Sequence, residues 1–543
     1  MRLKEATTYG PWLWGVLWAV LVLASLYDRP LLPVDETRYV SVAWEMWLRG
    51  DFLVPHLNGA PYSHKPPLLF WMINAGWAVV GVTDWWARLV APLFGFGSLL
   101  LAAALARRLW PASQAWLIAP LFLLGSFYWD LFTTVTMFDL IMCFWTLTGL
   151  IGLVDVWQGK PLRGWCLYAL AIGLGVLSKG PAILVYLLPS AIFAPLWAVS
   201  RPGSFWRHWY LILPVAILGG AAIALTWAIP AGFAGGDAYR NAIFWGQSAG
   251  RMVDSFAHQQ PVWWYLPVIP ALLLPWVIWP TFLVRTWRAI QSRTNTGPNP
   301  GLRLTAIWGF GTVIIFSMIS GKQPHYMLPM FPAIALAAAY GLSRAPALSS
   351  RWDLLPPALI TAALGAVLLF APEIGLVTGH PEVTLLISRW WSVILFAAAL
   401  WLVFRPLREL SARLVTLTST SVLVVIVLQF AARPVVQELY GVQSVADYVA
   451  GAQAQGYAVA NYGKYHGQYN FLGRLRQPVS EIGDETVSDW LETHPKSIIV
   501  SYQKTLPAET APIFTTRFRS GTLVIWDGED VKRNPHLPRR DAN

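Results

Sequence analysis

Long stretches without charged residues recur along the first 432 residues and alternate with short segments rich in arginine and lysine. The first stretch, Ala6–Tyr27, has 22 residues, enough for an α-helix to cross the roughly 30 Å hydrocarbon core of a bilayer. Twelve further stretches share this character: Leu89–Ala106, Gln114–Trp129, Leu140–Val154, Gly164–Ser178, Gly180–Ser200, Trp209–Tyr239, Pro261–Val284, Leu304–Gly321, Tyr326–Ser343, Leu354–Pro372, Trp390–Phe404 and Leu414–Ala432. The pattern predicts a polytopic α-helical membrane protein with about 13 transmembrane helices.

One further apolar run, Pro66–Val82, decides the topology. If it does not span, the basic clusters between the other runs fall on the same side as Arg2 and Lys4, as the positive-inside rule requires. These clusters include Arg107 and Arg108, Lys160 and Arg163, Arg201 and Arg207, Arg285 and Arg288, and Arg405 and Arg413. We therefore expect a cytoplasmic N-terminus, an uncleaved first helix and an interfacial helix at Pro66–Val82. The long loops 28–88 and 231–262 are then periplasmic.

The chain changes character at residue 433. Residues 433–543 hold 12 basic and 12 acidic residues, and amphipathic helices are predicted at Ser444–Ala454 and Asp484–His494. Short strands are predicted at Tyr457–Asn461, Ser497–Tyr502 and Gly521–Trp526. We expect a transmembrane domain over 1–432 and a small C-terminal α/β domain over 433–543, which thirteen spans place in the periplasm.

Composition narrows the function classes. Charged residues make up 12% of the chain and hydrophobic residues 56%, which excludes a string of soluble domains. In a soluble protein, the formal charge of +11 would suggest a nucleic-acid partner. Here the excess positive charge lies in the predicted cytoplasmic loops, so no nucleic-acid partner is expected. The two cysteines, Cys143 and Cys166, form neither a disulfide framework nor a metal-binding pair. Walker, GxGxxG, GxSxG and HExxH motifs do not occur in the sequence.

Polar residues gather on the predicted outer side. Taken singly, they can be explained as a solvated loop, a helix-start acid at Asp139 or a snorkelling lysine at Lys179. Together they predict a site at the membrane surface, where lysine and arginine would bind an anionic headgroup such as a phosphate and a carboxylate could act as a base. The candidates are Asp35, Glu36, Arg38, Tyr39, Tyr62, Lys65, Asp139, Lys179, Arg251, His258, Lys322 and Tyr326. The scattered histidines favour polar contacts over metal binding, and no metal ligands are assigned.

An ordered set of motifs resembles the GT-C glycosyltransferases that use polyprenyl-phosphate sugars. The set comprises Asp35-Glu36-x-Arg38-Tyr39, Lys65-Pro66-Pro67-Leu68, Asp139, Ser178-Lys179-Gly180-Pro181 and Tyr326-Met327-Leu328-Pro329. Within that class the chain is most similar to bacterial aminoarabinose transferases, which modify lipid A, and to protein O-mannosyltransferases. The match covers roughly residues 10–345. Tyr465-His466-Gly467-Gln468-Tyr469-Asn470-Phe471 resembles the outer domain of the aminoarabinose branch.

The resemblance implies roles for the matched residues. Asp35 would be the catalytic acid–base residue in a direct, inverting displacement, and Asp139 a second catalytic acid that orients sugar or acceptor. Lys65, Arg38 and Tyr326 would bind the donor phosphate. The remaining candidates would contact substrate, namely Glu36, Tyr39, Tyr62, Lys179, Arg251, His258 and Lys322.

The expected partners are a polyprenyl-phosphate-linked sugar, lipid A or another envelope acceptor, and membrane lipids, with the protein acting as a monomer in the bacterial inner membrane. No cofactor is expected to be required, although Asp35 and Glu36 leave room for a divalent ion. Three alternatives stay open. The acceptor could be a protein hydroxyl, the protein could be a lipid or sugar transporter, or the outer domain could be an anchored binding module. A transporter would carry charges near the membrane midplane, whereas the uncharged runs here have their charges at the ends.

Overall fold

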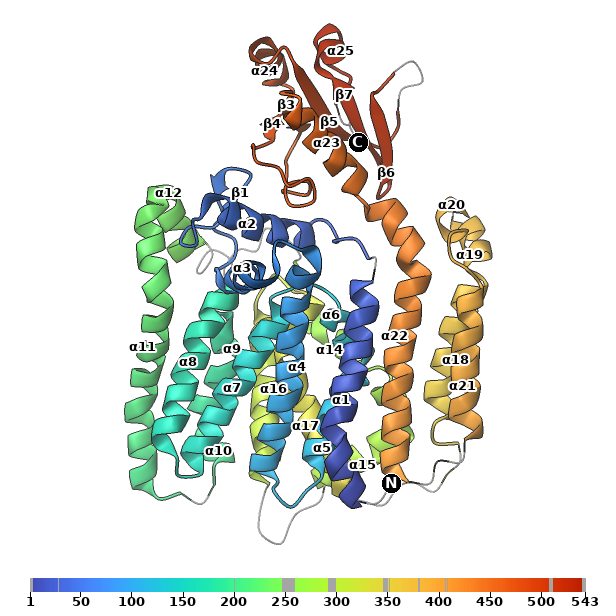
Figure 1. Ribbon diagram of the computed structural model, residues 1–543. Helices are drawn as coiled ribbons and strands as arrows, with labels where there is room; N and C mark the ends of the chain where they lie inside the picture. Colours follow the sequence, from blue (N-terminus) through green and yellow to red (C-terminus); the bar gives the residue numbers. More distant parts are fainter. Residues whose placement is uncertain are drawn as a thin grey trace.

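Apolar runs become a bundle of long helices in the computed structural model, and the small domain sits on one end of that bundle (Figure 1). The structure describes residues 3–27, 29–199, 201–246, 259–291, 299–344, 350, 352–378, 381–405, 407, 409–506 and 511–539. We call the end of the bundle that carries the small domain the site end. The N-terminus lies at the opposite end (Figure 1).

Most helices of the first half of the chain lie in the predicted runs, but the helix at Asp35–Arg49 stands in the first loop and was not predicted. The helices are α1 (Leu3–Leu26), α2 (Asp35–Arg49), α3 (Leu68–Val80), α4 (Asp84–Leu109), α5 (Ala115–Leu124), α6 (Phe127–Thr133), α7 (Asp139–Trp157), α8 (Pro161–Lys179), η1 (Gly180–Ala182), α9 (Ile183–Ile192), α10 (Ala194–Trp197), α11 (Gly203–Ala234), α12 (Gly236–Asn241) and η2 (Ala242–Gly246). A short antiparallel hairpin joins α2 to α3 and consists of β1 (His56–Leu57) and β2 (Ala60–Pro61).

The second half contains more broken helices. They are η3 (Val262–Trp264), α14 (Tyr265–Leu272), η4 (Trp276–Ile278), α15 (Pro280–Gln291), α16 (Pro300–Met318), η5 (Pro324–Met330), α17 (Phe331–Arg344), α18 (Leu355–Leu369), α19 (Ala371–Thr378), α20 (Pro381–Thr384), α21 (Trp390–Phe404) and α22 (Leu410–Tyr440). Proline accounts for part of this, because Pro275 stands between α14 and η4 and Pro280 begins α15, both within the predicted run Pro261–Val284.

The structure supports a multi-pass membrane protein without confirming a count of thirteen spans. Within the described residues, seven helical stretches are long and apolar enough to cross a membrane, or up to nine if each of two bent pairs is one span. The bent pairs are α5–α6 and α18–α19. Several predicted spans are shorter apolar helices, including Gly10–Leu26 and α21. Helix α3 lies across the site end of the bundle, as expected for the interfacial run (Figure 1).

A tight reversal joins α8 to α9 within one of these long stretches. Gly180 has φ +77°, in the left-handed region that glycine tolerates best, and it ends α8 at Lys179. Trp197, just beyond α9, packs its ring against Trp157 and Trp209 at 5.8 and 6.3 Å. The chain has therefore returned to the end of the bundle where α8 began, and Lys179 is left at the site end.

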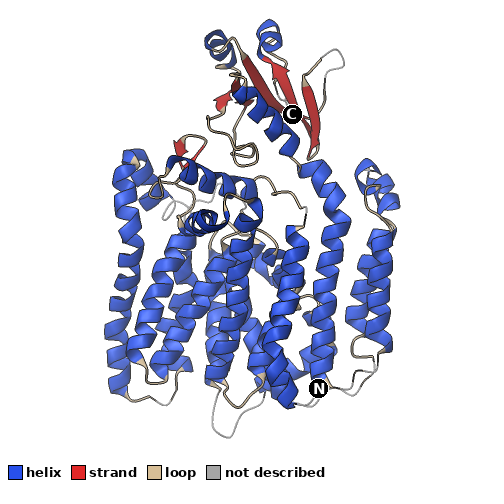
Figure 2. Cartoon of the chain, in the orientation of Figure 1, coloured by secondary structure: helices blue, strands red, loops and turns tan. Residues whose placement is uncertain are grey.

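Residues after α22 form a five-stranded mixed sheet. Its strands are β3 (Ala458–Tyr462), β4 (Ser480–Ile482), β5 (Ser497–Gln503), β6 (Phe514–Phe518) and β7 (Gly521–Asp527), in the order β4-β3-β5-β7-β6. The neighbours of β3 run parallel to it and the remaining pairs are antiparallel. Helix α23 (Gln443–Ala454) packs on one face, while α24 (Val487–Thr493) and α25 (Gly528–Arg533) pack on the other. Figure 2 shows these strands confined to the domain above the helices.

The domain matches the predicted class and adds elements that the sequence pattern did not reveal. All three predicted strands and both predicted helices are present, while β4, β6 and α25 were not predicted. Helix α22 passes through the expected boundary at residue 433 and ends at Tyr440. A continuous helix thus carries the chain from the bundle into the small domain.

Candidate functional site

A buried carboxylate fixes the start of α2, the helix that carries most of the first-loop candidates. Glu36 accepts hydrogen bonds from both terminal nitrogens of Arg29, at 2.7 and 2.9 Å, and from the backbone N–H groups of Leu32 and Thr136. Burial alone would raise the pKa of Glu36, but Arg29 and these N–H donors outweigh it and lower the pKa to about 2. Both carboxylate oxygens are therefore occupied, and Glu36 joins the first loop to the segment before α7.

The neighbouring carboxylate, Asp35, faces the other way. Its side chain is 54% exposed, and its Oδ1 accepts hydrogen bonds from Arg38 Nη2 and, at 3.1 Å, from the Tyr39 hydroxyl. Tyr39 is buried against the edge of the Phe138 ring at 4.9 Å. Arg38 and Tyr39 lie three and four residues after Asp35, so one face of α2 presents an accessible carboxylate beside a guanidinium.

A second cluster lies at the site ends of α7 and α8. Lys179 Nζ donates to Asp139 Oδ1 at 2.6 Å, and the ammonium group lies 5.1 Å from the centre of the Tyr326 ring. Lys65 approaches from the first loop, with Nζ 5.8 Å from the centre of the Phe138 ring, and interacts electrostatically with Asp139. Asp139 is 1% exposed, so its charge depends on these cations.

His325 links the two clusters. Its imidazole interacts electrostatically with Asp139, Lys179, Lys65 and Asp35. The carboxylate on α2 and the ion pair between α7 and α8 therefore both lie within electrostatic range of the same imidazole. His325 is one of the scattered histidines for which polar contacts were expected, and it was not among the predicted site residues, although it stands between two of them in Lys322-Gln323-Pro324-His325-Tyr326.

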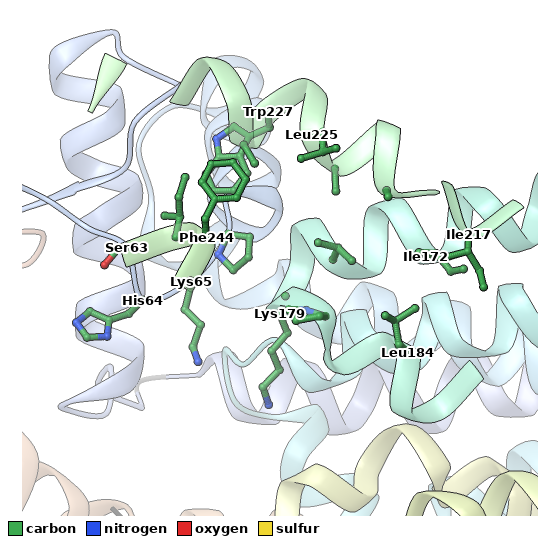
Figure 3. A pocket seen from close by; sticks show the side chains of 18 residues that line it. Ser63, His64, Lys65, Ile172, Lys179, Leu184, Ile217, Leu225, Trp227 and Phe244 are labelled. Atoms are coloured by element: carbon green, nitrogen blue, oxygen red, sulfur yellow. The ribbon is translucent and has the colours of Figure 1, made fainter. Parts of the chain in front are cut away.

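An apolar cavity of about 370 Å³ leads away from the two lysines between α8, α9 and α11. Figure 3 shows the Lys65 and Lys179 side chains next to each other, with Ile172, Leu184 and Ile217 farther along the cavity. A cavity with cationic groups at one end and aliphatic walls beyond them suits a molecule with an anionic head and a hydrocarbon tail.

Of the other predicted site residues, one joins the cluster around Asp35 and one lies apart from both clusters. Tyr62 is buried near Phe70 and interacts electrostatically with Arg38, so it belongs to the first cluster. Lys322 does not join either cluster, because its ammonium group donates to the backbone carbonyls of Gln260 and Ile319 at 2.8 and 2.6 Å. It holds the end of the second loop against the start of η5. Arg251 and His258 lie outside the described residues.

Sequence reasoning also missed the residues that support the site. Arg29 and Thr136 hold Glu36, and Phe138 packs against both Tyr39 and Lys65. In the sequence, Arg29 cannot be told apart from other arginines that flank a membrane span. Every residue except proline has a backbone N–H, so the sequence does not show that the N–H of Thr136 binds Glu36. Among the residues that the structure describes, no three His, Cys, Asp or Glu side chains are arranged to hold a metal ion.

Comparison with known proteins agrees with this arrangement. Residues 64–232 match the family model described as dolichyl-phosphate-mannose-protein mannosyltransferase. The fold resembles that of ArnT from Cupriavidus metallidurans bound to undecaprenyl phosphate, with a TM-score of 0.70 and 19% identity over 97% of this chain and 98% of that one. The apo structure of the same protein gives a TM-score of 0.69 at 20% identity. The fold and site define a GT-C membrane glycosyltransferase.

Closer sequence relatives make the assignment more specific. The chain is 30% identical over 417 residues to undecaprenyl phosphate-alpha-4-amino-4-deoxy-L-arabinose arabinosyl transferase 2 of Pseudomonas fluorescens, covering 73% of this chain and 72% of that protein. The corresponding transferase of Serratia proteamaculans is 30% identical over 414 residues, covering 73% and 71%. The chain belongs to this family of arabinosyl transferases. A glycosyltransferase is thereby favoured over a transporter or an anchored binding module.

The buried Glu36 contact generates a stability prediction. Glu36→Ala leaves Arg29, which is 13% exposed, without its carboxylate and should lower the free energy of unfolding by about 3–5 kcal/mol. Thermal unfolding of the purified protein in detergent measures this change. The exposed pair of Glu373 and Arg389 provides the control, because Glu373→Ala should cost only about 0–1 kcal/mol.

The same contact should depend on acidity in a defined direction. The folded-state pKa of about 2 lies below the ordinary 4.5, so the stabilisation is complete above pH 4.5 and is lost as the pH falls towards 2. Glu36→Ala should show a smaller loss of stability over this interval than the unmodified protein. Equal acid sensitivity of the two proteins would contradict the role given to Glu36.

Proposed function

We propose that this protein transfers 4-amino-4-deoxy-L-arabinose from undecaprenyl phosphate to a phosphate of lipid A or of a similar envelope glycolipid. The observation that supports this most directly is the apolar cavity with Lys65 and Lys179 at its polar end. The names of the relatives from Pseudomonas fluorescens and Serratia proteamaculans give the donor and its sugar. Lipid A as acceptor rests on the resemblance to the aminoarabinose transferases.

The donor would lie with its phosphate at the two lysines and the first part of its isoprenoid chain between α8 and α11. The cavity is too small for the whole isoprenoid, so the remainder would extend into the bilayer. Lys65 stands in the same first loop as Asp35 and lines the polar end of the cavity. We therefore assign to Lys65 the stabilisation of charge that develops on the phosphate as it leaves.

The reaction is a displacement at the anomeric carbon of the sugar. An oxygen of the acceptor phosphate forms a bond to that carbon while the bond to the donor phosphate oxygen breaks, and undecaprenyl phosphate leaves with the bonding electron pair. An acceptor phosphate is already anionic near neutral pH and needs little deprotonation. Asp35 would then chiefly orient Arg38 and the sugar. With a hydroxyl acceptor, Asp35 would have to remove a proton.

The exposed carboxylate should be essential for turnover but not for folding. Asp35→Asn keeps the side-chain shape and removes the charge that holds Arg38, so we expect a loss of transfer of about 100-fold or more at unchanged thermal stability. Transfer from undecaprenyl phosphate-aminoarabinose in nanodiscs is the assay. Asp237→Asn, at a carboxylate that is 84% exposed, is the matched control. Near-normal turnover in Asp35→Asn would show that Asp35 is not a catalytic residue.

Lys65 should act on the donor. We expect Lys65→Ala to reduce kcat by about 100-fold through loss of charge stabilisation on the leaving phosphate, and Lys65→Arg to recover part of that loss. Lys160→Ala removes an exposed lysine at the opposite end of the bundle and should leave kcat unchanged. A kcat for Lys65→Ala equal to that of the unmodified protein would contradict this assignment.

The site end and the small domain are proposed to face the periplasm of a bacterial inner membrane. Clusters of arginine and lysine at the other ends of the helices support this orientation, for example Arg107 and Arg108 at the end of α4. The donor and the acceptor would then meet in the outer leaflet.

Cysteine labelling tests this orientation. In a Cys166→Ser background, which removes the exposed native thiol, Ser488→Cys in α24 should react with a membrane-impermeant maleimide in spheroplasts. Gln158→Cys, in the turn between α7 and α8, should react only after the membrane is opened. The reverse pattern would place the site on the cytoplasmic side.

A further inference from the structure

The small domain reaches down to the helix that carries Asp35 and Arg38. The connection between β3 and β4 lies along α2, where Ser41 Oγ donates to the Gly467 carbonyl at 2.7 Å and accepts from the Phe471 N–H at 3.1 Å. The Trp44 indole N–H donates to the Leu475 carbonyl at 3.0 Å. Both Ser41 and Trp44 are buried. We call residues 464–479 the docking segment.

Further contacts join the docking segment to the C-terminal half of α2, to the hairpin after it and to α3. Asn58 exchanges two hydrogen bonds with the backbone of Val479, at 2.7 and 2.8 Å, while Asn470 Nδ2 donates to Glu45 at 3.0 Å. The rings of Trp77 and Phe471 stack at 5.4 Å with 3° between their planes. The segment is therefore seated on the membrane domain by polar and apolar contacts together.

This seating puts a histidine beside the catalytic face. Ser41 lies one helical turn after Arg38, and its partner Gly467 directly follows His466. Gly467 has φ +73°, and a Cβ there would meet Leu57 Cδ1 at 2.4 Å, so the turn is closely fitted to the first loop. The side chain of Gln468 accepts a hydrogen bond from the His466 N–H at 3.0 Å and fixes the backbone next to the imidazole.

The surroundings of His466 are predominantly cationic. Arg38, Lys464 and Arg519 interact with the imidazole, and Glu481 is the acidic group that acts on it. Burial, and then the charge of Arg38 and Lys464, lowers the pKa of His466 below its ordinary value. An anion bound between His466 and Arg38 would reverse this tendency, because a negative charge favours the protonated imidazole.

We propose that His466, together with Arg38, binds the phosphate of the acceptor. This inference rests on the proposed function and adds that the small domain supplies part of the acceptor site. Lys65 and Lys179 hold the donor phosphate, whereas Arg38, for which the family resemblance implied a donor role, meets the acceptor phosphate together with the docking segment. The two anions thus approach the sugar from separate groups of cations.

Steady-state kinetics of the full-length protein in nanodiscs test the proposal. Undecaprenyl phosphate-aminoarabinose and purified bisphosphorylated lipid A are varied in turn. For His466→Ala we expect the acceptor KM to rise by about tenfold, with the donor KM and kcat within about twofold of the unmodified protein. His536→Ala, at an exposed histidine of the same domain, should change none of these values.

A charge-retaining variant separates binding from mere packing. His466→Arg carries a permanent positive charge, so its acceptor KM should stay low from about pH 6 to about pH 8, while that of the unmodified protein rises as the imidazole loses its proton. An arginine variant that is as impaired as the alanine variant would show that His466 acts only through its shape and would overturn the proposal.

The proposed function and this inference fail in different ways. No transfer to lipid A by the unmodified protein would remove both. An active unmodified protein whose acceptor KM is unchanged in His466→Ala would remove only the role of His466. A rise in the donor KM of equal size would move the histidine to the donor side and contradict the proposal as stated.

Discussion

The contact between Glu36 and Arg29 is the constraint on which the site depends. A carboxylate that is 2% exposed is tolerable only where cations and N–H donors surround it, and here four donors do so. One of them is the backbone of Thr136, just before α7, so the same group fixes the start of α2 and the approach to Asp139. Without it, the segments that carry Asp35 and Asp139 would lose the hydrogen bond that joins them and keep the packing of Tyr39 against Phe138.

The two carboxylates at the site then take different roles because their surroundings differ. Asp139 is buried and accepts a hydrogen bond from Lys179, whose ammonium group lies over the Tyr326 ring. Asp35 stays half exposed, with its charge directed at Arg38 and open to a substrate. A buried ion pair keeps its charges in fixed positions, whereas an accessible carboxylate can change its hydrogen-bond partners during a reaction.

Much of this was predictable from sequence, and the reasons for the rest are physical. Uncharged runs of helical length fix which segments are buried in the bilayer, and the basic clusters bring Asp35, Lys65, Asp139 and Lys179 to one end. The span count stayed open because prolines and bends divide runs such as Pro261–Val284 into short helices. The placement of Glu36 and Lys322 on backbone groups could not be foreseen, since a sequence does not reveal which N–H or carbonyl lies within reach. Roles at individual site positions remain predictions.

The bond between Ser41 and Gly467 joins positions 426 residues apart in the chain. The loop that carries Asp35 therefore leaves the ribosome long before the docking segment does. The face of α2 that carries Ser41 and Trp44 therefore stays uncovered until the remaining helices have been inserted and the small domain has folded. Assembly of the site is in this way a late event, and a chain that ended after α22 would contain Lys65 and Lys179 yet lack the docking segment against which α2 packs.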